Sequence, residues 1–228
     1  TIPHATLTAV TPMDDWQAVA ERVLAHPEVT GAVPLAELEG MLSYRGAMLP
    51  VQVNGIDPSR EDEVSIVGSH MQRGTLGNLQ PGEYGVVIGE LIARRFALGI
   101  GDKLTLVVPE ASDSAAGVTP RMQRLTVAGI FKVGAELDGT LALIHIADAA
   151  QILRLEPGQV PALRLALADL YQAPRIGGEL NAALGEGYRI DDWTRTQGSL
   201  FAAMQMEKTM IGLLLLLIIA VAACNIIA

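Results

Sequence analysis

The residue types that most often carry chemistry are scattered along this sequence and form no known active-site motif. The serines lack the sequence context of a nucleophile elbow, and the carboxylates form no pair in an obviously apolar setting. Asp138 precedes a predicted strand and is interpreted as a turn residue. Four histidines stand singly, without the spacing of metal ligands: His4, His26, His70 and His145. The sequence therefore predicts no catalytic residue and no metal site.

One glycine-rich stretch raises the question of phosphate binding. Residues 99–102, Gly-Ile-Gly-Asp, join a predicted helix at 90–98 to a predicted strand at 103–108. Phosphate loops have the opposite order, because they lead from a strand into the N-terminus of a helix, where free backbone N–H groups attract the anion. We therefore predict a plain turn here, with no phosphate site.

A long connection between two predicted strands is the most unusual segment ahead of the C-terminus. Residues 109–123, PEASDSAAGVTPRMQ, link the strand at 104–108 to the strand at 125–133. Hairpin loops usually have about two to five residues, and longer ones are commonly functional or disordered. Val118 and Met122 are apolar residues close to prolines, and they would suit insertion into a cleft of a partner. The alternative interpretation is a flexible surface loop.

Charge and cysteine content limit the possible partners and chemistry. The net charge is −9 at pH 7 and the basic residues do not cluster, which argues against nucleic acid as a partner. Cys224, the single cysteine, lies in an apolar run at the C-terminus, so the rest of the chain has no disulfide. Roughly 205 residues precede that run, which is enough for one large or two small cores.

Several segments of the chain carry the sequence signals of helices. Thr11 is predicted to cap a helix with Pro12 at its first position, and Pro27 is predicted to close it. Residues 60–63 are a short charged stretch that we expect to be exposed to solvent. Further helices are predicted at 90–98, 147–155 and 174–184, and one from about 197.

Alternating apolar residues predict the strands. Leu49, Val51 and Val53 alternate with polar residues or proline, and the turn at 45–46 would pair this strand with one near 39–44. Further strands are predicted at 84–88, 103–108, 125–133, 140–146, 163–167 and 188–190.

The last residues predict a transmembrane helix. Residues 210–228, MIGLLLLLIIAVAACNIIA, carry no charge and are long enough to span a bilayer, which needs about 18 or more apolar residues. A buried helix of a soluble protein is the alternative. No proline separates this run from the helix predicted at about 197, so one continuous helix would couple the folded region to the membrane. Because the chain opens without a signal peptide, we expect another span upstream of Thr1.

Three stretches together resemble a known family. They are residues 86–109 (VVIGELIARRFALGIGDKLTLVVP), 124–149 (RLTVAGIFKVGAELDGTLALIHIADA) and 206–227 (MEKTMIGLLLLLIIAVAACNII). They are similar to the LolC/LolE family, which includes the hybrid LolF type. This family provides the membrane subunits of the lipoprotein-releasing ABC transporter, within the FtsX/MacB superfamily. The resemblance covers essentially the whole chain. It implies a subunit of the inner (cytoplasmic) membrane of a Gram-negative bacterium, with residues 1 to about 205 in the periplasm.

The resemblance also implies an α+β (mixed α/β) fold in two subdomains. A porter-like subdomain would comprise residues 1–56 and 159–195. A β-rich Sabre-like subdomain, residues 57–158, would be inserted between these parts and carry the loop at 109–123. Residues 196–228 would form a connecting helix and a transmembrane helix.

In this family the long hairpin loop of LolC recruits the periplasmic lipoprotein chaperone LolA. The residues implied here are Pro109, Ser112, Ala116, Gly117, Val118, Thr119, Pro120, Arg121 and Met122. Residues 113–119 depart from the LolC pattern, which puts individual contacts in doubt. Residues 13–16 look more like LolE and residues 206–208 more like LolC, so LolC or LolF is favoured over LolE.

The resemblance implies extrusion of lipoproteins from the membrane without covalent chemistry. Acyl chains would contact Met206, Met210, Ile211 and Leu214 at the periplasmic end of the second span, although these side chains would equally suit packing against lipid or other helices. ATP and Mg²⁺ would bind a separate LolD-type ATPase, so no cofactor is expected in this segment. The remaining implied partners are a second LolC/LolE-type membrane subunit, lipoprotein substrates and membrane lipid.

Two other functions are compatible with these sequence features. A MacB/FtsX-type subunit would share the fold and bind a channel protein or a cell-wall hydrolase instead of a chaperone. An extracytoplasmic sensor domain of a receptor would bind a small molecule and be followed by a signalling module. Binding of the long loop to a lipoprotein chaperone would separate the LolC/LolE interpretation from the MacB/FtsX type. Further hydrophobic spans after Ala228, instead of a signalling module, would separate a transporter from a receptor.

Overall fold

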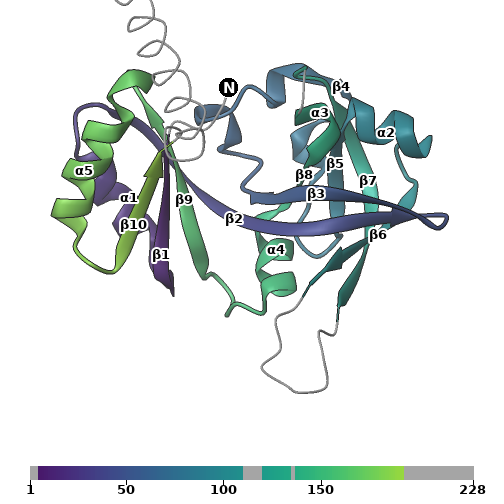
Figure 1. Cartoon of the computed structure of the whole chain (residues 1–228), viewed down its shortest axis with the longest axis horizontal. Helices are drawn as coiled ribbons and strands as arrows, with labels where there is room; N and C mark the ends of the chain where they lie inside the picture. Colours follow the sequence, from purple (N-terminus) through teal and green to yellow (C-terminus); the bar gives the residue numbers. More distant parts are fainter. Residues whose placement is uncertain (1–4, 110–119, 135–136, 193–228) are drawn as a thin grey trace, which may run out of the picture.

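The computed structural model describes residues 5–109, 120–134 and 137–192, which form a mixed α/β fold (Figure 1). The predicted fold class is confirmed, and strands dominate. The strands are β1 (Ala5–Met13), β2 (Val29–Tyr44), β3 (Ala47–Ile56), β4 (Met71–Arg73), β5 (Gly85–Gly89), β6 (Lys103–Val108), β7 (Arg121–Phe131), β8 (Leu141–His145), β9 (Val160–Leu167) and β10 (Tyr188–Asp192). The α-helices are α1 (Trp16–Leu24), α2 (Glu90–Phe96), α3 (Leu137–Thr140), α4 (Ile146–Leu153) and α5 (Ala173–Leu184). Short 3₁₀ turns are η1 (Glu61–Glu63), η2 (Gly68–His70), η3 (Leu76–Asn78) and η4 (Leu170–Gln172).

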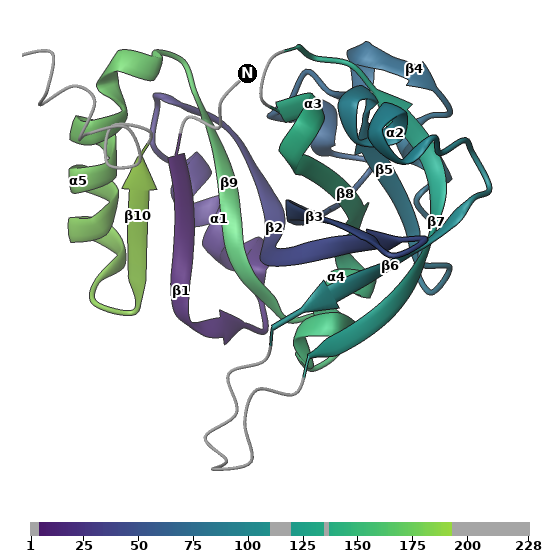
Figure 2. The ribbon, with the colours of Figure 1, turned by 45° about the vertical axis from the view of Figure 1, so that its right-hand side comes forward.

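The described strands join one mixed sheet. Their order is β10-β1-β9-β2-β3-β8-β5-β7-β4, and β6 pairs with both β2 and β7 beside this path. The first and last strands are neighbours, with Ala5 opposite Asp192 in the register. The described chain therefore starts and finishes at one end of the molecule, and the β6–β7 hairpin opens at the other end (Figures 1 and 2).

Two helices cover one face of the sheet formed by β10, β1, β9 and the first half of β2. Alternating leucines of β9, such as Leu163 and Leu165, pack with Val23 of α1 and Ile176 of α5 in one hydrophobic core. This core combines segments from both ends of the described chain. The apolar side chains of the helices and of the strands face this core. They recur along the chain with the periods of a helix and a strand, 3.6 and 2 residues.

The second half of β2 continues into a different core. Leu42 of β2, Leu106 of β6 and Leu125 of β7 are almost fully buried there, together with residues of α2 and α4. The turn between β2 and β3 places Arg45 and Gly46 at φ 47° and 85°, a left-handed pair that matches the twist of a tight hairpin. The predicted pairing of the strand at 49–53 through residues 45–46 is confirmed.

The first helix begins later than predicted. The expected cap, Thr11, and Pro12 lie in β1, which continues to Met13, and helix α1 starts at Trp16. Asp15 is the actual cap, because its Oδ1 accepts a hydrogen bond from the Ala18 N–H at 3.1 Å. Proline is tolerated in β1 because the pairing of β1 with β9 is irregular between Thr8 and Met13, where no regular ladder bond is needed.

The expectation that residues 60–63 are exposed to solvent was wrong for Glu61. The Glu61 side chain is only 1% exposed and accepts a hydrogen bond from Nη1 of Arg164 on β9, which is 8% exposed, at 2.7 Å. Burial raises the pKa of Glu61, and the Arg164 charge acts against that rise. A charged run can therefore hold an ion pair inside the fold when a distant strand supplies the counter-ion.

The division into two subdomains stays a prediction. The predicted boundaries at residues 56 and 158 separate much of the two cores, but β2 contributes Val29 and Ala32 to the first and Leu38 and Leu42 to the second. The connecting and transmembrane helices predicted at 196–228 lie outside the described residues. Among the residues that are described, no helix has the length and apolar character needed to cross a membrane.

Candidate functional site

The β6–β7 hairpin positions the segment that the sequence singled out. The two strands pair from Lys103 opposite Thr126 to Val108 opposite Arg121. The connection therefore comprises residues 109–120, which is shorter than the predicted 109–123. Arg121 and Met122 belong to β7, because the antiparallel ladder extends through them. A sequence pattern could not reveal this extension, because neither residue continues the apolar alternation of the strand.

The hairpin adds to an exposed apolar row that crosses four strands. By register, Pro50 of β3 lies opposite Met41 of β2, Met41 opposite Val107 of β6, and Val107 opposite Met122 of β7. Opposite residues of paired strands project from the same face of a sheet. The residues next to them, such as Leu42 and Leu106, project inward and are fully buried. The outer face thus keeps Met41 36% exposed and Met122 67% exposed.

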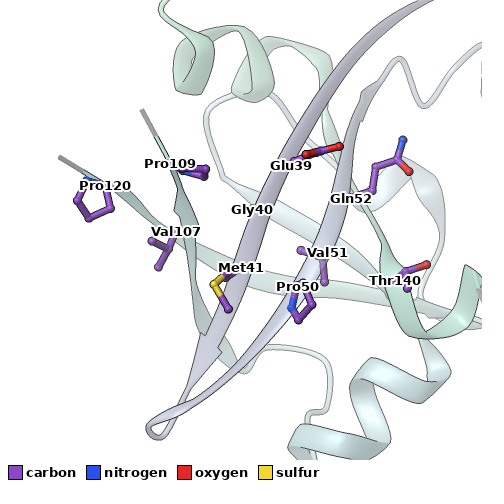
Figure 3. Close-up of a pocket in the computed structure, with 10 residues that line it drawn as sticks. All are labelled: Glu39, Gly40, Met41, Pro50, Val51, Gln52, Val107, Pro109, Pro120 and Thr140. Carbon is purple, nitrogen blue, oxygen red and sulfur yellow. The ribbon is translucent and has the colours of Figure 1, made fainter. Parts of the chain in front are cut away.

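A groove runs along this face beside the hairpin (Figure 3). Its volume is about 640 Å³, and it lies between β2, β3 and the base of the β6–β7 connection. A side chain at Gly40 is excluded, because its Cβ would lie 2.8 Å from the carbonyl oxygen of Val107. This glycine lets β6 approach β2 closely. Six residues define the groove for the argument below: Glu39, Met41, Pro50, Val107, Pro109 and Pro120.

One end of the groove is polar. Glu39 lies opposite Gln52 in the β2–β3 register, and Gln52 donates a hydrogen bond to Glu37 at 3.4 Å. Desolvation raises the pKa of Glu37, Arg164 opposes this rise, and Glu39 adds to it. No residue in the described part of the chain forms a hydrogen bond or ion pair with the Glu39 carboxylate. The outer face of β2 therefore changes from two carboxylates to an apolar row within a few residues.

The remaining predicted site residues lie outside the described residues. They are Ser112, Ala116, Gly117, Val118 and Thr119 of the connection, and Met206, Met210, Ile211 and Leu214 near the C-terminus.

Pro109, Pro120, Arg121 and Met122 are described, and all four lie at the mouth of the hairpin. Sequence reasoning missed Met41, Pro50 and Val107, which come close to them only through strand pairing. The one sequence signal that could have found this surface was Met41, a methionine at an outward-facing position of a strand with strong apolar alternation.

His4 lies outside the described residues, and several of the other polar residues considered for chemistry form hydrogen bonds within the fold. His145 accepts a hydrogen bond from the Ala147 N–H at the start of α4, and His26 bonds Glu179 at 3.0 Å. Asp138 is buried and accepts hydrogen bonds from the N–H groups of Val133 and Gly134. Within the ranges that the structure describes, no three His, Cys, Asp or Glu side chains gather as a metal site would require.

The expected plain turn at residues 99–102 is stabilised from within. The Gly99 N–H donates to Oδ2 of Asp102 at 2.7 Å, so this backbone donor is already used and an acidic side chain lies beside it.

The sequence matches the MacB-like periplasmic core domain over residues 3–183. The chain belongs to this family. It is 35% identical to the lipoprotein-releasing system transmembrane protein LolC of Xylella fastidiosa, over 99% of the chain and 54% of that protein. LolC of Neisseria meningitidis serogroup B is also 35% identical, over 99% of the chain and 55% of the relative. LolE of Haemophilus influenzae is 25% identical over 100% of the chain and 56% of the relative.

This member of the MacB-like family spans about half the length of the curated relatives it matches, 54% for the first of them. The predicted resemblance to the LolC/LolE family is confirmed. Among solved structures, the periplasmic region of MacB from Actinobacillus actinomycetemcomitans superposes with a TM-score of 0.51 at 10% identity, over 86% of this chain and 91% of that one. The extracellular domain of the transporter YknZ from Gram-positive bacteria gives 0.50 at 14% identity, over 82% and 98%. Both similarities show the fold alone.

Proposed function

We propose that this chain is the periplasmic domain of an inner-membrane subunit of a lipoprotein-releasing ABC transporter. The observation that carries the proposal is the 35% identity to LolC proteins of two organisms over 99% of the chain. In this role the segment itself catalyses nothing and holds no cofactor. ATP and Mg²⁺ bind a separate LolD-type ATPase, and a second LolC/LolE-type subunit completes the membrane part of the complex.

The docking site for a LolA-type chaperone, in this proposal, is the β6–β7 hairpin with its connection at 109–120. The hairpin opens at the end of the molecule opposite the first residue of β1 and the last residue of β10, so a partner reaches it from the side away from these two residues (Figure 1). Exposed apolar side chains at its mouth, above all Met122, supply area that docking would remove from water. Such exposed apolar patches are typical of protein–protein contact sites.

The path of the substrate follows from the same proposal. Lipoprotein acyl chains leave the bilayer near Met206, Met210, Ile211 and Leu214 and pass to the chaperone docked on the hairpin. Closure driven by the ATPase provides the energy, and no covalent bond is made or broken in this domain. The hairpin's contribution is to hold the acceptor close to the point of release, which converts transfer between two free molecules into transfer within one complex.

Calorimetry of the full chain in detergent with the cognate chaperone tests the docking site. Replacing residues 112–119 by a short Gly-Ser turn is expected to abolish binding, and Met122→Glu is expected to weaken it strongly. Val10→Glu is the matched control, because Val10 is an exposed apolar residue of β1 at 76% exposure, on a strand that contributes nothing to the groove.

Absence of binding by the unmodified chain would overturn the docking proposal and favour a LolE-type or MacB-type subunit. Unchanged binding in the loop replacement would move the docking site elsewhere on the domain.

A further inference from the structure

The outer face of β2 is amphipathic along its length. Glu37 and Glu39 project from the same face as Met41, because residues two apart in a strand share a face. The opposite positions on β3 repeat the change, with Gln52 beside Glu39 and Pro50 beside Met41. The groove therefore runs from a polar end to an apolar end, as Figure 3 shows. A ligand that matches it needs a polar head and an apolar chain.

The apolar end of the groove combines a well-anchored backbone with side chains that can adapt to a ligand. Val107 and Met41 form the floor, and Pro109 and Pro120 border it. The buried neighbours Leu42 and Leu106 anchor the two strands from the other side. Methionine is flexible and polarisable, and it accommodates chains of varied conformation. A volume of about 640 Å³ is within the range of small-ligand sites.

The polar end selects the chemistry of the head. The Glu39 carboxylate can only accept hydrogen bonds when ionised, and no described residue donates to it. Glu37 adds negative charge two residues away, and the chain as a whole has a net charge of −9. An anionic head would be repelled there, whereas an ammonium or amide head donates to the free carboxylate.

We propose that this groove binds the acylated end of a lipid-modified polypeptide, with an N–H-bearing head at Glu39 and an acyl chain over Met41 and Val107. The inference rests on the proposed function, because it gives the substrates of that transporter a binding site next to the hairpin where the chaperone docks. The groove receives the chain after it leaves the bilayer and before the chaperone takes it. An open groove suits this step, since a transient ligand must be able to leave.

Photolabelling tests the site with two matched probes. The full 228-residue chain in phosphatidylcholine nanodiscs is exposed to N-palmitoyl-lysine amide or to palmitate, each with a diazirine in the acyl chain. Labelled residues are identified by mass spectrometry. We expect the lysine amide probe to label the peptides that contain Met41 and Val107 about fivefold more than palmitate does, since a charge-assisted hydrogen bond is worth at least that factor. Equal labelling by both probes would overturn the assignment of the head.

Variants separate the two ends of the groove. Met41→Glu is expected to remove labelling of the Val107 peptide, because a charge then lies where the acyl chain would rest. Met48→Glu is the control, because Met48 is also an exposed methionine of the β2–β3 hairpin, at 47% against 36% for Met41, but does not line the groove. Glu39→Gln is expected to keep the acyl labelling and to lose the preference for the lysine amide probe.

Besides equal labelling by both probes, three outcomes overturn the proposal: labelling confined to residues outside the groove, an equal loss in Met41→Glu and Met48→Glu, or an unchanged preference in Glu39→Gln. The first would leave the chaperone as the occupant of this face. The chaperone calorimetry is independent of these readouts. Groove labelling without chaperone binding would reject the proposed docking role alone, and chaperone binding without groove labelling would reject this inference alone.

Discussion

The buried pair of Glu61 and Arg164 makes the most demanding prediction about stability. The two side chains are 1% and 8% exposed and share one hydrogen bond of 2.7 Å. The second oxygen of Glu61 and Nε of Arg164 have no partner among the described residues. Removing only Arg164 therefore leaves a carboxylate buried without a counter-ion, which typically costs about 3–5 kcal/mol. Glu61 can partly escape this cost by taking up a proton, so we expect Arg164→Met to cost about 3 kcal/mol at neutral pH.

Urea unfolding of the chain in mild detergent, followed by tryptophan fluorescence, measures this cost. The double variant Glu61→Met with Arg164→Met is expected to be close to the original stability, since apolar replacement of a whole buried pair is often neutral. Arg189→Met breaks the exposed pair with Asp191 and should cost less than about 1 kcal/mol. A cost for Arg164→Met no greater than that for Arg189→Met would refute the reasoning, because it would mean that water reaches the pair.

The same pair predicts the sign of a pH dependence. Burial raises the pKa of Glu61, so the folded chain holds that proton more tightly than the unfolded chain does. This group's contribution to stability therefore falls as pH rises from its unfolded pKa through its folded pKa. Arg164 is the strongest influence opposing the raised pKa, so the fall is expected to be steeper in Arg164→Met. The free energy of unfolding of the original chain and of Arg164→Met, measured at about pH 5 and about pH 8, checks this expectation. An equal loss of stability in the two proteins would contradict it.

Three further changes test the local structure by thermal or urea unfolding. Asp15→Ala should cost about 1 kcal/mol because it removes the cap of α1, whereas Thr11→Ala should change stability little. Gly40→Ala should cost about 1–3 kcal/mol, since the new methyl group forces β6 away from β2, and circular dichroism would show whether the fold is retained. Asp148→Ala should cost about 1–3 kcal/mol or more, because this fully buried carboxylate accepts hydrogen bonds from two backbone N–H groups that would lose their partner. A neutral effect of Asp148→Ala would indicate that water replaces the carboxylate.

Local periodicity was sufficient for most of the elements. The strand at 103–108 was predicted with the bounds that β6 has, and the tight turn at 45–46 was predicted because it joins two strand patterns. Errors occurred where tertiary pairing overrode a local signal. Thr11 and Pro12 make a convincing helix start, but β1 pairs with β9 again at Met13, so the strand continues past both residues. Strand pairing outweighed the local preference there.

The candidate site also combines features that the local sequence predicts with features that only the fold decides. The sequence alone singled out the long connection after β6, because its length and composition depart from those of ordinary hairpin loops. The resemblance to the LolC/LolE family was also contained in local motifs. The apolar row and groove depended on the tertiary structure, because Pro50, Met41, Val107 and Met122 become neighbours only through the register of four strands. Glu61 and Arg164 are 103 residues apart, and no local pattern encodes their pairing. Periodicity reports which face of an element is apolar, whereas the fold decides which faces meet and which remain open.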